Sequence, residues 1–314
     1  MSSSEPLDIK NYIGLTSDTP IRFIASDVDG TLVNDAKSVD PEVVSAVRAA
    51  RESGIRVAIA SGRAWHEMDD VIDAMPCLRY FVCTNGAYVM DKEGKKELVH
   101  ISFDKTRAID LVRKLMTYGV FVEAYVKAEI FGQYPTVGNE TLQAERFFRP
   151  NIRPFILKTR TMVPDLLAHL ESLPEGPEKI QIFYGDERIR ERILADLRDD
   201  FQGAATDGKG RERFYDVLES SEGNLEFVLP HTTKGTAVEA LANHWGYTPD
   251  EVMTFGDSEN DLSMIRFAGA SVAMGNARDN VKAAARYETT DNNNYGVARA
   301  LYSAIAHNRE LEGK

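Results

Sequence analysis

The sequence predicts an α/β protein with a doubly wound parallel sheet, into which a second, α+β domain is inserted. Three observations support this fold class. Short apolar runs alternate with helical patterns up to about residue 90, strands become amphipathic in the middle of the chain, and strand–helix alternation returns near Pro230. Buried parallel strands are apolar throughout, whereas antiparallel strands often keep one polar face. The first and last segments are therefore expected to share one sheet.

The first segment contains three predicted strands separated by helices. Asp40 has the residue type of an N-cap and Pro41 suits the first helical position, so a helix is expected to begin there and to end before Gly54. The strands are expected at Ile21–Ser26, Arg56–Ala60 and Tyr80–Cys83, and a second helix at Ala64–Met75. This alternation predicts parallel strands with helical crossovers.

The middle segment predicts an antiparallel sheet with one face in water and helices on the other. Its amphipathic strands are expected at Gly119–Val126, Lys179–Tyr184 and Phe214–Leu218, and its helices at Asp104–Tyr118, Val163–Leu173 and Glu187–Asp199.

The last segment returns to the first pattern. It predicts a helix at Thr233–Trp245, strands at Val252–Phe255 and Ala270–Met274, and a final helix from Val297. The predicted organisation is a flexible tail over residues 1–20, a core formed by 21–90 and 230–314, and an inserted domain at 91–229.

Length and composition restrict the function. The chain has 314 residues, which corresponds to about two domains. Its net charge of −12 disfavours nucleic-acid binding, although local cations and a metal can still attract a small phosphorylated metabolite. No apolar run reaches the roughly 18 residues of a membrane span, and the polar N-terminal segment does not resemble a signal peptide. A cytoplasmic location is therefore expected. The spacing of Cys77 and Cys83 predicts two reduced thiols.

Two aspartates follow the first predicted strand, in the segment Asp27-Val28-Asp29-Gly30-Thr31. Residues two apart on an extended backbone point the same way. Two carboxylates in one pocket favour a bound cation or a shared proton. A polar turn would use the same residue types. An EF-hand loop is excluded, because it needs glycine at its sixth position and Gly30 is the fourth residue from Asp27.

Two further groups of residues are candidates for anion binding. Ser61-Gly62-Arg63 follows the second strand at a helix start, where a hydroxyl and backbone N–H groups attract negative charge. The alternative is that Ser61 is an N-cap. Lys234 opens a later helix and could hold a phosphate as a point charge, although exposed lysines are common.

An acidic segment, Gly256-Asp257-Ser258-Glu259-Asn260-Asp261, follows another predicted core strand. Ser258 and Asp261 have the form of a capping box. Three acids and an amide within five positions exceed what a cap needs, and they suit an oxygen-ligated cation such as Mg²⁺. All four motifs follow the carboxyl ends of core strands or lie just beyond, where open α/β sheets bind ligands.

Taken together, these motifs resemble the haloacid-dehalogenase superfamily, and more closely its Cof-type phosphatases. The DVDGTL segment from Asp27 is similar to the first signature of that superfamily, Ser61-Gly62-Arg63 to the second, Lys234 with its glycine to the third, and the acidic segment from Gly256 to the fourth. The segment Thr84–Ala87 is similar to the sequence that leads into the cap domain. The resemblance implies a Rossmann-like core with an inserted α+β cap.

The resemblance also implies roles for the matched residues. Asp27 would be the nucleophile and Asp29 the general acid and base. Mg²⁺ would lie on the Asp27 side chain, the Asp29 backbone carbonyl and Asp257, with Asp261 acting through a water or orienting the site. The phosphoryl oxygens would be held by Val28, Ser61, Gly62, Lys234 and Asn260. Arg63 and Asn85 are candidates for contacts with the substrate or the cap.

The implied function is Mg²⁺-dependent hydrolysis of a small phosphomonoester, such as a sugar phosphate, through an aspartyl-phosphate. A phosphosugar mutase on the same core is the main alternative. A non-catalytic phosphometabolite-binding protein is disfavoured, because the acidic and basic residues of all the motifs are present. The inserted domain is expected to determine substrate choice, because Arg146–Arg149 and Arg153 offer cations and rings there. A surface helix with a buried aromatic face would show the same sequence pattern. Trp65 and His66 are rival candidates. The sequence predicts neither the individual substrate nor the oligomeric state.

Overall fold

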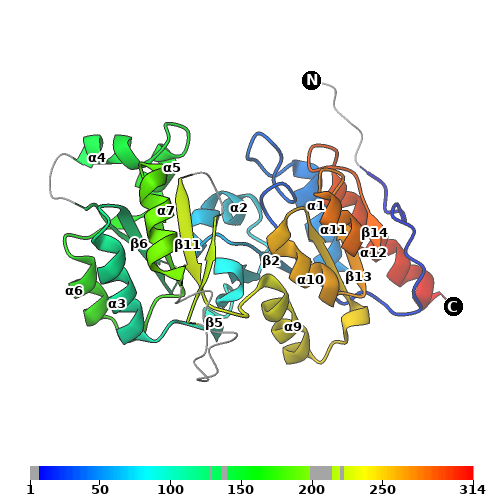
Figure 1. The fold of residues 1–314 in the computed structure, drawn as a ribbon. Helices are drawn as coiled ribbons and strands as arrows, with labels where there is room; N and C mark the ends of the chain where they lie inside the picture. The colour runs from blue at the N-terminus through cyan, green and yellow to red at the C-terminus, as the bar shows by residue number, and fades with distance from the viewer. Residues whose placement is uncertain (1–6, 128, 136–139, 199–213, 220–222, 314) are drawn as a thin grey trace. The chain divides into compact units, whose positions relative to one another are not determined.

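A computed structural model describes residues 7–127, 129–135, 140–198, 214–219 and 223–313. The chain divides into two compact units, and each is described by itself. The core unit consists of Met1–Arg63, Met68–Val99 and Thr233–Lys314, and the second unit of Ala64–Glu67 and His100–Thr232. Figure 1 shows both units, coloured along the chain.

The core unit is built on an eight-stranded sheet with the order β14-β13-β12-β1-β2-β3-β4-β5. Strand β1 (Phe23–Ser26) is central, and it pairs in parallel with β2 (Arg56–Ala60) and with β12 (Val252–Gly256). All four residues of β1 are buried, as expected for a strand covered on both faces. The remaining strands are β3 (Tyr80–Cys83), β4 (Tyr88–Asp91), β5 (Lys96–His100), β13 (Ala270–Ala273) and β14 (Tyr287–Glu288). The predicted doubly wound parallel sheet is confirmed.

The sheet departs from the prediction at one edge. Strand β4 pairs with β3 in antiparallel orientation, and β5 lies next to β4. These two strands extend the core sheet beyond residue 90, where the sequence predicted that the inserted domain begins.

The helices of the core unit begin largely where the sequence indicates. Asp40 caps α1 by accepting a hydrogen bond from the N–H of Glu42 at 2.8 Å, and Pro41 occupies the first turn. The α-helices are α1 (Pro41–Glu52), α2 (Asp69–Ala74), α9 (Lys234–Trp245), α10 (Leu262–Phe267), α11 (Asp279–Ala284) and α12 (Gly296–Glu312), with short 3₁₀ turns at Trp65–Met68, Thr84–Gly86, Pro249–Glu251 and Glu259–Asp261.

The predicted helix Ala64–Met75 is not continuous. A 3₁₀ turn at Trp65–Met68 precedes α2, and Met68 has φ −112°, which lies outside the helical range. The physical reason is the side chain of Glu67, which turns back to accept the N–H of Ala64 at 2.8 Å and pairs with Arg160 of the second unit. Residues 64–67, including Trp65 and His66, therefore belong to the second unit.

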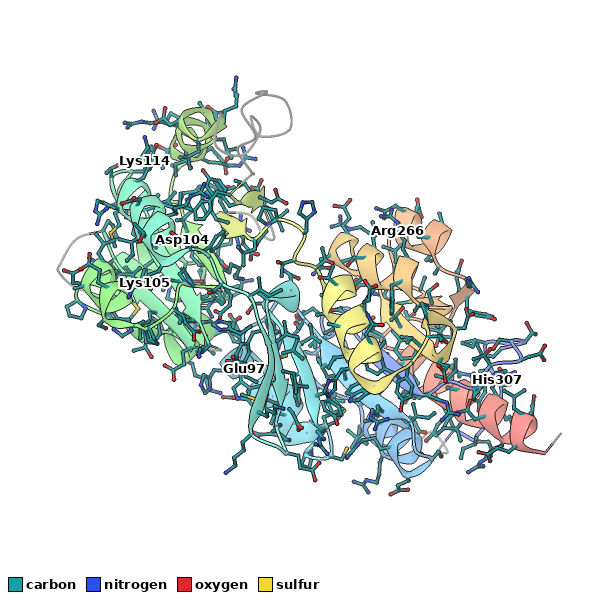
Figure 2. All side chains as sticks on the ribbon, turned by 90° about the horizontal axis from the view of Figure 1, so that it is seen from below. Glu97, Asp104, Lys105, Lys114, Arg266 and His307 are labelled. Atoms are coloured by element: carbon teal, nitrogen blue, oxygen red, sulfur yellow. The ribbon has the colours of Figure 1, made fainter. Side chains whose placement is uncertain are left out.

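Residues 7–20 pack along α12, although the sequence predicted a flexible tail over 1–20. The N–H of Ile13 donates to Ser303 at 3.1 Å, and that of Ile21 donates to Asn308 at 2.8 Å. His307, labelled in Figure 2, lies 3.1 Å from the carbonyl oxygen of Thr19. These contacts hold the segment more firmly than its polar composition suggested.

The second unit contains a six-stranded sheet with the order β10-β11-β9-β6-β7-β8. The strands are β6 (Phe121–Val126), β7 (Glu129–Gln133), β8 (Thr161–Met162), β9 (Lys179–Phe183), β10 (Asp216–Leu218) and β11 (Asn224–Val228). All pairs are antiparallel except β7 with β8.

One face of this sheet packs against helices, as predicted. Apolar residues of β6, β9 and β11 form a buried core with α3 (Lys105–Met116), α6 (Leu166–Ser172) and α7 (Glu187–Asp196). Figure 2 labels Asp104 and Lys105 at the start of α3, where the Asp104 carboxylate accepts the N–H of Arg107 at 2.9 Å. Asp199, the predicted end of α7, lies outside the described residues.

The opposite face of the second sheet is partly covered within the unit itself, and there the predicted exposed face is wrong. The rings of Phe121 and Phe183 pack in an aromatic cluster with Phe147 and Phe148. Charged residues of this face pair within the unit. Arg160 pairs with Glu123 at 3.0 Å, and Lys179 pairs with Glu226 at 3.3 Å. The shorter helices α4 (Glu140–Phe147) and α5 (Arg153–Thr159) complete the unit. In the part of the chain that the structure describes, no helix is long and apolar enough to cross a bilayer. Cys77 and Cys83 are free thiols, as predicted.

Candidate active site

The residues singled out by the sequence lie at the carboxyl ends of three adjacent core strands. Asp27 follows β1, Ser61 follows β2 and Asp257 follows β12. Because parallel neighbours end at the same edge of a sheet, their polar side chains meet there. The fourth motif residue, Lys234, begins α9.

Lys234 lies between two aspartates. Its ammonium donates to Asp27 Oδ1 and to Asp261 Oδ1, both at 2.6 Å. The Lys234 side chain is 1% exposed, and those of Asp27 and Asp261 are 7% and 0% exposed. Lys234 is therefore not an exposed surface lysine, which was the alternative that the sequence left open. A buried ammonium shared by two carboxylates keeps its charge, and the pKa of Lys234 is raised because the two aspartates outweigh the effect of burial.

Asp261 orients the acidic segment. Its Oδ2 accepts the N–H groups of Asp257 and Ser258, both at 2.9 Å, so the capping box read from the sequence is present. Asp257 in turn accepts the hydroxyls of Thr31 at 3.2 Å and Ser258 at 3.1 Å. The carboxylate of Asp257 is thus held in one orientation from both sides.

Gly30 is required by the same geometry. It has φ +77°, and a Cβ atom at this position would lie 2.6 Å from Asp257 Oδ2. Only glycine combines a left-handed conformation with this close approach.

The pKa of Asp27 is raised to about 8, mainly by burial and then by the neighbouring Asp261, with a smaller effect of Asp257 and an opposing effect of Lys234. Burial and Asp261 also raise the pKa of Asp257. Burial disfavours the charged form of each carboxyl group, and the single ammonium of Lys234 does not offset three carboxylates.

The three carboxylates lie close enough together to be candidates for a metal site. One oxygen from each of Asp27, Asp257 and Asp261 lies within 4.8 Å of the others. Such an oxygen-only cluster with excess negative charge fits a hard divalent cation.

Asp29 makes a contact that the sequence did not predict. Its Oδ2 accepts Arg63 Nε at 2.8 Å and its Oδ1 accepts Arg63 Nη2 at 2.7 Å. Lys37 lies 3.4 Å from Oδ1. Burial alone would raise the pKa of Asp29, but the hydrogen bonds and charge of Arg63, together with Lys37, lower it. Arg63 was named only as a candidate contact for the substrate or the cap. Its partner depends on a side-chain direction that sequence spacing does not encode.

The second motif forms a compact loop next to β3. The N–H of Ser61 donates to the carbonyl of Val82 at 2.8 Å, and the Ser61 carbonyl accepts the N–H of Asn85 at 2.9 Å. A Cβ on Gly62 would lie 3.1 Å from Asn85 Oδ1. That same oxygen accepts the amide of Asn260 at 3.2 Å. Asn85 therefore connects the second and fourth motifs, a role that the sequence did not reveal. Val28 is buried beside Asp27.

The second unit has a cavity of its own, with a volume of about 380 Å³. It is lined by residues that include the predicted stretch Arg146–Arg149 and, from the other side, Tyr184–Glu187. The rings of Phe147 and Phe148 are buried in an aromatic cluster, as the alternative interpretation of this stretch expected.

Comparison with known proteins identifies the class of protein. A family model described as haloacid dehalogenase-like hydrolase matches residues 24–301. The chain belongs to this family. The family resemblance inferred from the motifs is confirmed.

Individual relatives narrow the class. The chain is 30% identical to phosphatase YwpJ of Bacillus subtilis, with 90% of this chain and 99% of the relative covered. It is 28% identical to the pyridoxal phosphate phosphatase YbhA of Escherichia coli, over 90% and 98% of the two chains. A solved haloacid dehalogenase-like hydrolase from Bacteroides thetaiotaomicron superposes with a TM-score of 0.74 at 27% identity, covering 90% of this chain and 98% of the other. The chain is an enzyme of the phosphoric monoester hydrolase class.

Proposed function

We propose that this enzyme hydrolyses a small phosphomonoester, with Mg²⁺, through an aspartyl-phosphate on Asp27. The observation that carries the proposal is the position of the Asp27 carboxylate. It stands at the tip of the central strand, held by a buried ammonium, and Asp29 follows two residues later. Phosphoryl transfer depends mainly on positioning and charge neutralisation, which this arrangement supplies.

The proposed reaction has two steps. In the first, an Asp27 carboxylate oxygen attacks phosphorus, the bond from phosphorus to the leaving oxygen breaks, and that oxygen takes a proton from Asp29. In the second, a water oxygen attacks phosphorus while Asp29 takes a proton from the water, and the bond to Asp27 breaks to release phosphate. Lys234 and the Ser61-Gly62 loop would hold the phosphoryl oxygens, together with the Val28 backbone and Asn260.

The side chains of Asp27 and Asp257 and the backbone carbonyl of Asp29 would hold Mg²⁺, and the bonds of Asp261 suit an orienting role. The cation would supply positive charge where two anions must approach. Ca²⁺ takes more ligands at longer distances, so it should support activity poorly. Metal-stripped enzyme should be inactive in excess EDTA and regain activity with Mg²⁺. Full turnover under EDTA would refute the metal requirement.

Asp27→Asn should abolish turnover, and Asp29→Asn should slow both steps. A partition experiment tests the covalent intermediate. If glycerol competes with water as acceptor, and the leaving group departs first, every substrate passes through the same phosphoenzyme. The ratio of phosphate to glycerol phosphate must then be the same for all substrates. A ratio that varies with the leaving group, together with the absence of a borohydride-reducible adduct at Asp27, would eliminate the covalent route.

The substrate is proposed to be a small metabolite. Relatives of this chain are named as phosphatases for pyridoxal phosphate and for 5-amino-6-(5-phospho-D-ribitylamino)uracil, both small phosphomonoesters. A phosphate-release screen over sugar phosphates, nucleotides, flavin mononucleotide and pyridoxal phosphate would name the preferred class. Free phosphate in this screen, rather than an isomerised sugar phosphate, also separates a phosphatase from a mutase. The predicted cytoplasmic location and the absence of nucleic-acid partners remain predictions.

Substrate choice is proposed to depend on the second unit, because the core motifs offer contacts only to phosphate and metal. Substituting Arg146 or Arg149, which line the cavity of that unit, should change the ranking of substrates. An unchanged ranking would refute a role of this cavity in substrate choice. If changes at Trp65 or His66 altered the ranking instead, specificity would lie in the segment after the second motif, which belongs to the same unit.

A further inference from the structure

We propose that Arg63 is a positioning residue for the second step of the reaction: its guanidinium holds the Asp29 carboxylate in the orientation from which it takes the proton of the attacking water. This inference rests on the proposed aspartyl-phosphate mechanism. It assigns Arg63 to the hydrolysis of the phosphoenzyme. From its position after Ser61-Gly62, a contact with the substrate or the cap was expected instead.

The geometry of the pair is the first argument. Arg63 Nε and Nη2 meet Asp29 Oδ2 and Oδ1 at 2.8 and 2.7 Å, which is the two-pronged arrangement that fixes a carboxylate most closely. A lysine ammonium is a single charged centre, so it does not fix the plane of a carboxylate. The contact of Lys37 with Asp29 Oδ1, at 3.4 Å, is of this kind.

The second argument is that Arg63 is itself anchored. Its Nη1 lies 3.3 Å from Asp70 Oδ1, its N–H donates to Ser61 Oγ at 3.2 Å, and its carbonyl accepts the N–H of Thr84 at 3.0 Å. The Arg63 side chain is 16% exposed, whereas that of Asp29 is 46% exposed. The more exposed carboxylate is therefore held by a partner that the core unit fixes at several points.

The choice of substrate determines in which step the loss of this contact is seen. Asp29 donates a proton in the proposed first step and takes one in the second, and the fork orients the same carboxyl group for both. When the leaving group departs without a proton, only the second step needs Asp29. With such a substrate, Arg63 should therefore contribute to breakdown of the phosphoenzyme and little to its formation.

The test uses p-nitrophenyl phosphate, because p-nitrophenolate departs without a proton. With Arg63→Gln, rapid mixing should show a burst of about one nitrophenolate per enzyme, followed by turnover slowed on the order of tenfold to a hundredfold. Phosphate should accumulate on Asp27 in acid-quenched samples. Because kcat/KM reports only the steps up to release of the leaving group, it should stay near the wild-type value while kcat and KM fall together. Arg63→Lys should give an intermediate kcat.

Arg79→Gln is the matched control. Arg79 holds Asp91 with the same fork, at 2.8 and 2.7 Å, but it precedes β3 at the edge of the sheet opposite to the site. It should give neither a burst nor a lower kcat. The thermal midpoint of each variant checks folding.

Three results would overturn the inference. A fall in kcat/KM equal to the fall in kcat, without a burst, would indicate a general loss of the site. A raised KM with an unchanged kcat would indicate that Arg63 binds substrate instead. Wild-type kinetics in Arg63→Gln would remove any role. In contrast, wild-type enzyme that fails the glycerol partition test would refute the covalent mechanism itself, whatever Arg63 does.

Discussion

Lys234→Met should destabilise the core unit strongly, and more so at alkaline pH. Methionine keeps the length and apolar stem of the side chain but removes the ammonium that donates to Asp27 and Asp261 at 2.6 Å. The two carboxylates would remain buried, at 7% and 0% exposure, without their cation.

The magnitude follows from this burial. Removing one partner of a buried ion pair costs about 3–5 kcal/mol, because the remaining charge is uncompensated. Asp27 can avoid part of the cost by taking a proton, since burial and Asp261 already raise its pKa to about 8. The loss should therefore be smaller near pH 6 and larger near pH 9, with about 3–5 kcal/mol as its upper range. With a denaturant slope of roughly 2 kcal/mol per molar urea, a loss in that range lowers the midpoint by about 1.5–2.5 M.

The assay is urea unfolding in EDTA, followed by tryptophan fluorescence. A Trp65→Phe background leaves Trp245 as the single tryptophan, and Trp245 packs against Phe23 with ring centroids 5.0 Å apart, so it reports on the core unit. Lys179→Met is the control, because it removes a buried lysine of the second unit that pairs with Glu226. An unchanged Trp245 midpoint in Lys234→Met at pH 9 would refute the reasoning.

Three other predictions concern the site. In EDTA, the free energy of unfolding should fall as pH rises from about 4 to 8. The raised pKa of Asp27 lets the folded state keep a proton that the unfolded state releases. Urea midpoints that rise over this range would contradict the raised pKa of Asp27. Mg²⁺ should accordingly raise the thermal midpoint more at pH 9 than at pH 6, where protons compete for the same carboxylate. Gly30→Ala should cost about 1–2 kcal/mol through its φ of +77° and also reduce kcat by displacing Asp257. Gly54→Ala, with φ +83° and open space around its Cβ, should cost similar stability and leave kcat intact.

The core sheet could be predicted because its sequence signal is local. Strands β2 and β3 have the bounds predicted for them, since each is a continuous apolar run that ends at a polar motif. The second unit was less predictable. Strands β7, β8 and β11 were missed. Strand β6 carries Glu123, whose charge is buried through its pairing with Arg160, and an alternation pattern does not reveal such a partner.

The candidate site shows the same limit. The motifs identified Asp27, Lys234 and Asp257, but spacing gave no sign that Lys234 is buried between two carboxylates. Nor did it predict the fork between Arg63 and Asp29, because the direction of a long side chain depends on tertiary packing.

The pairing of β1 with β12 also affects how the chain folds during its synthesis. Phe23 pairs with Val252, so the second unit lies in the sequence between the two strands that form the centre of the core sheet. During synthesis, β1 can pair with β2 early. Its other edge stays unpaired until the ribosome has added the second unit, α9 and then β12. A nascent chain halted near residue 232 would expose an apolar edge strand, which is a known route to aggregation. C-terminal truncations that remove β12 should therefore appear in the insoluble fraction unless a chaperone covers that edge. The second unit can form its own sheet before the core sheet is complete.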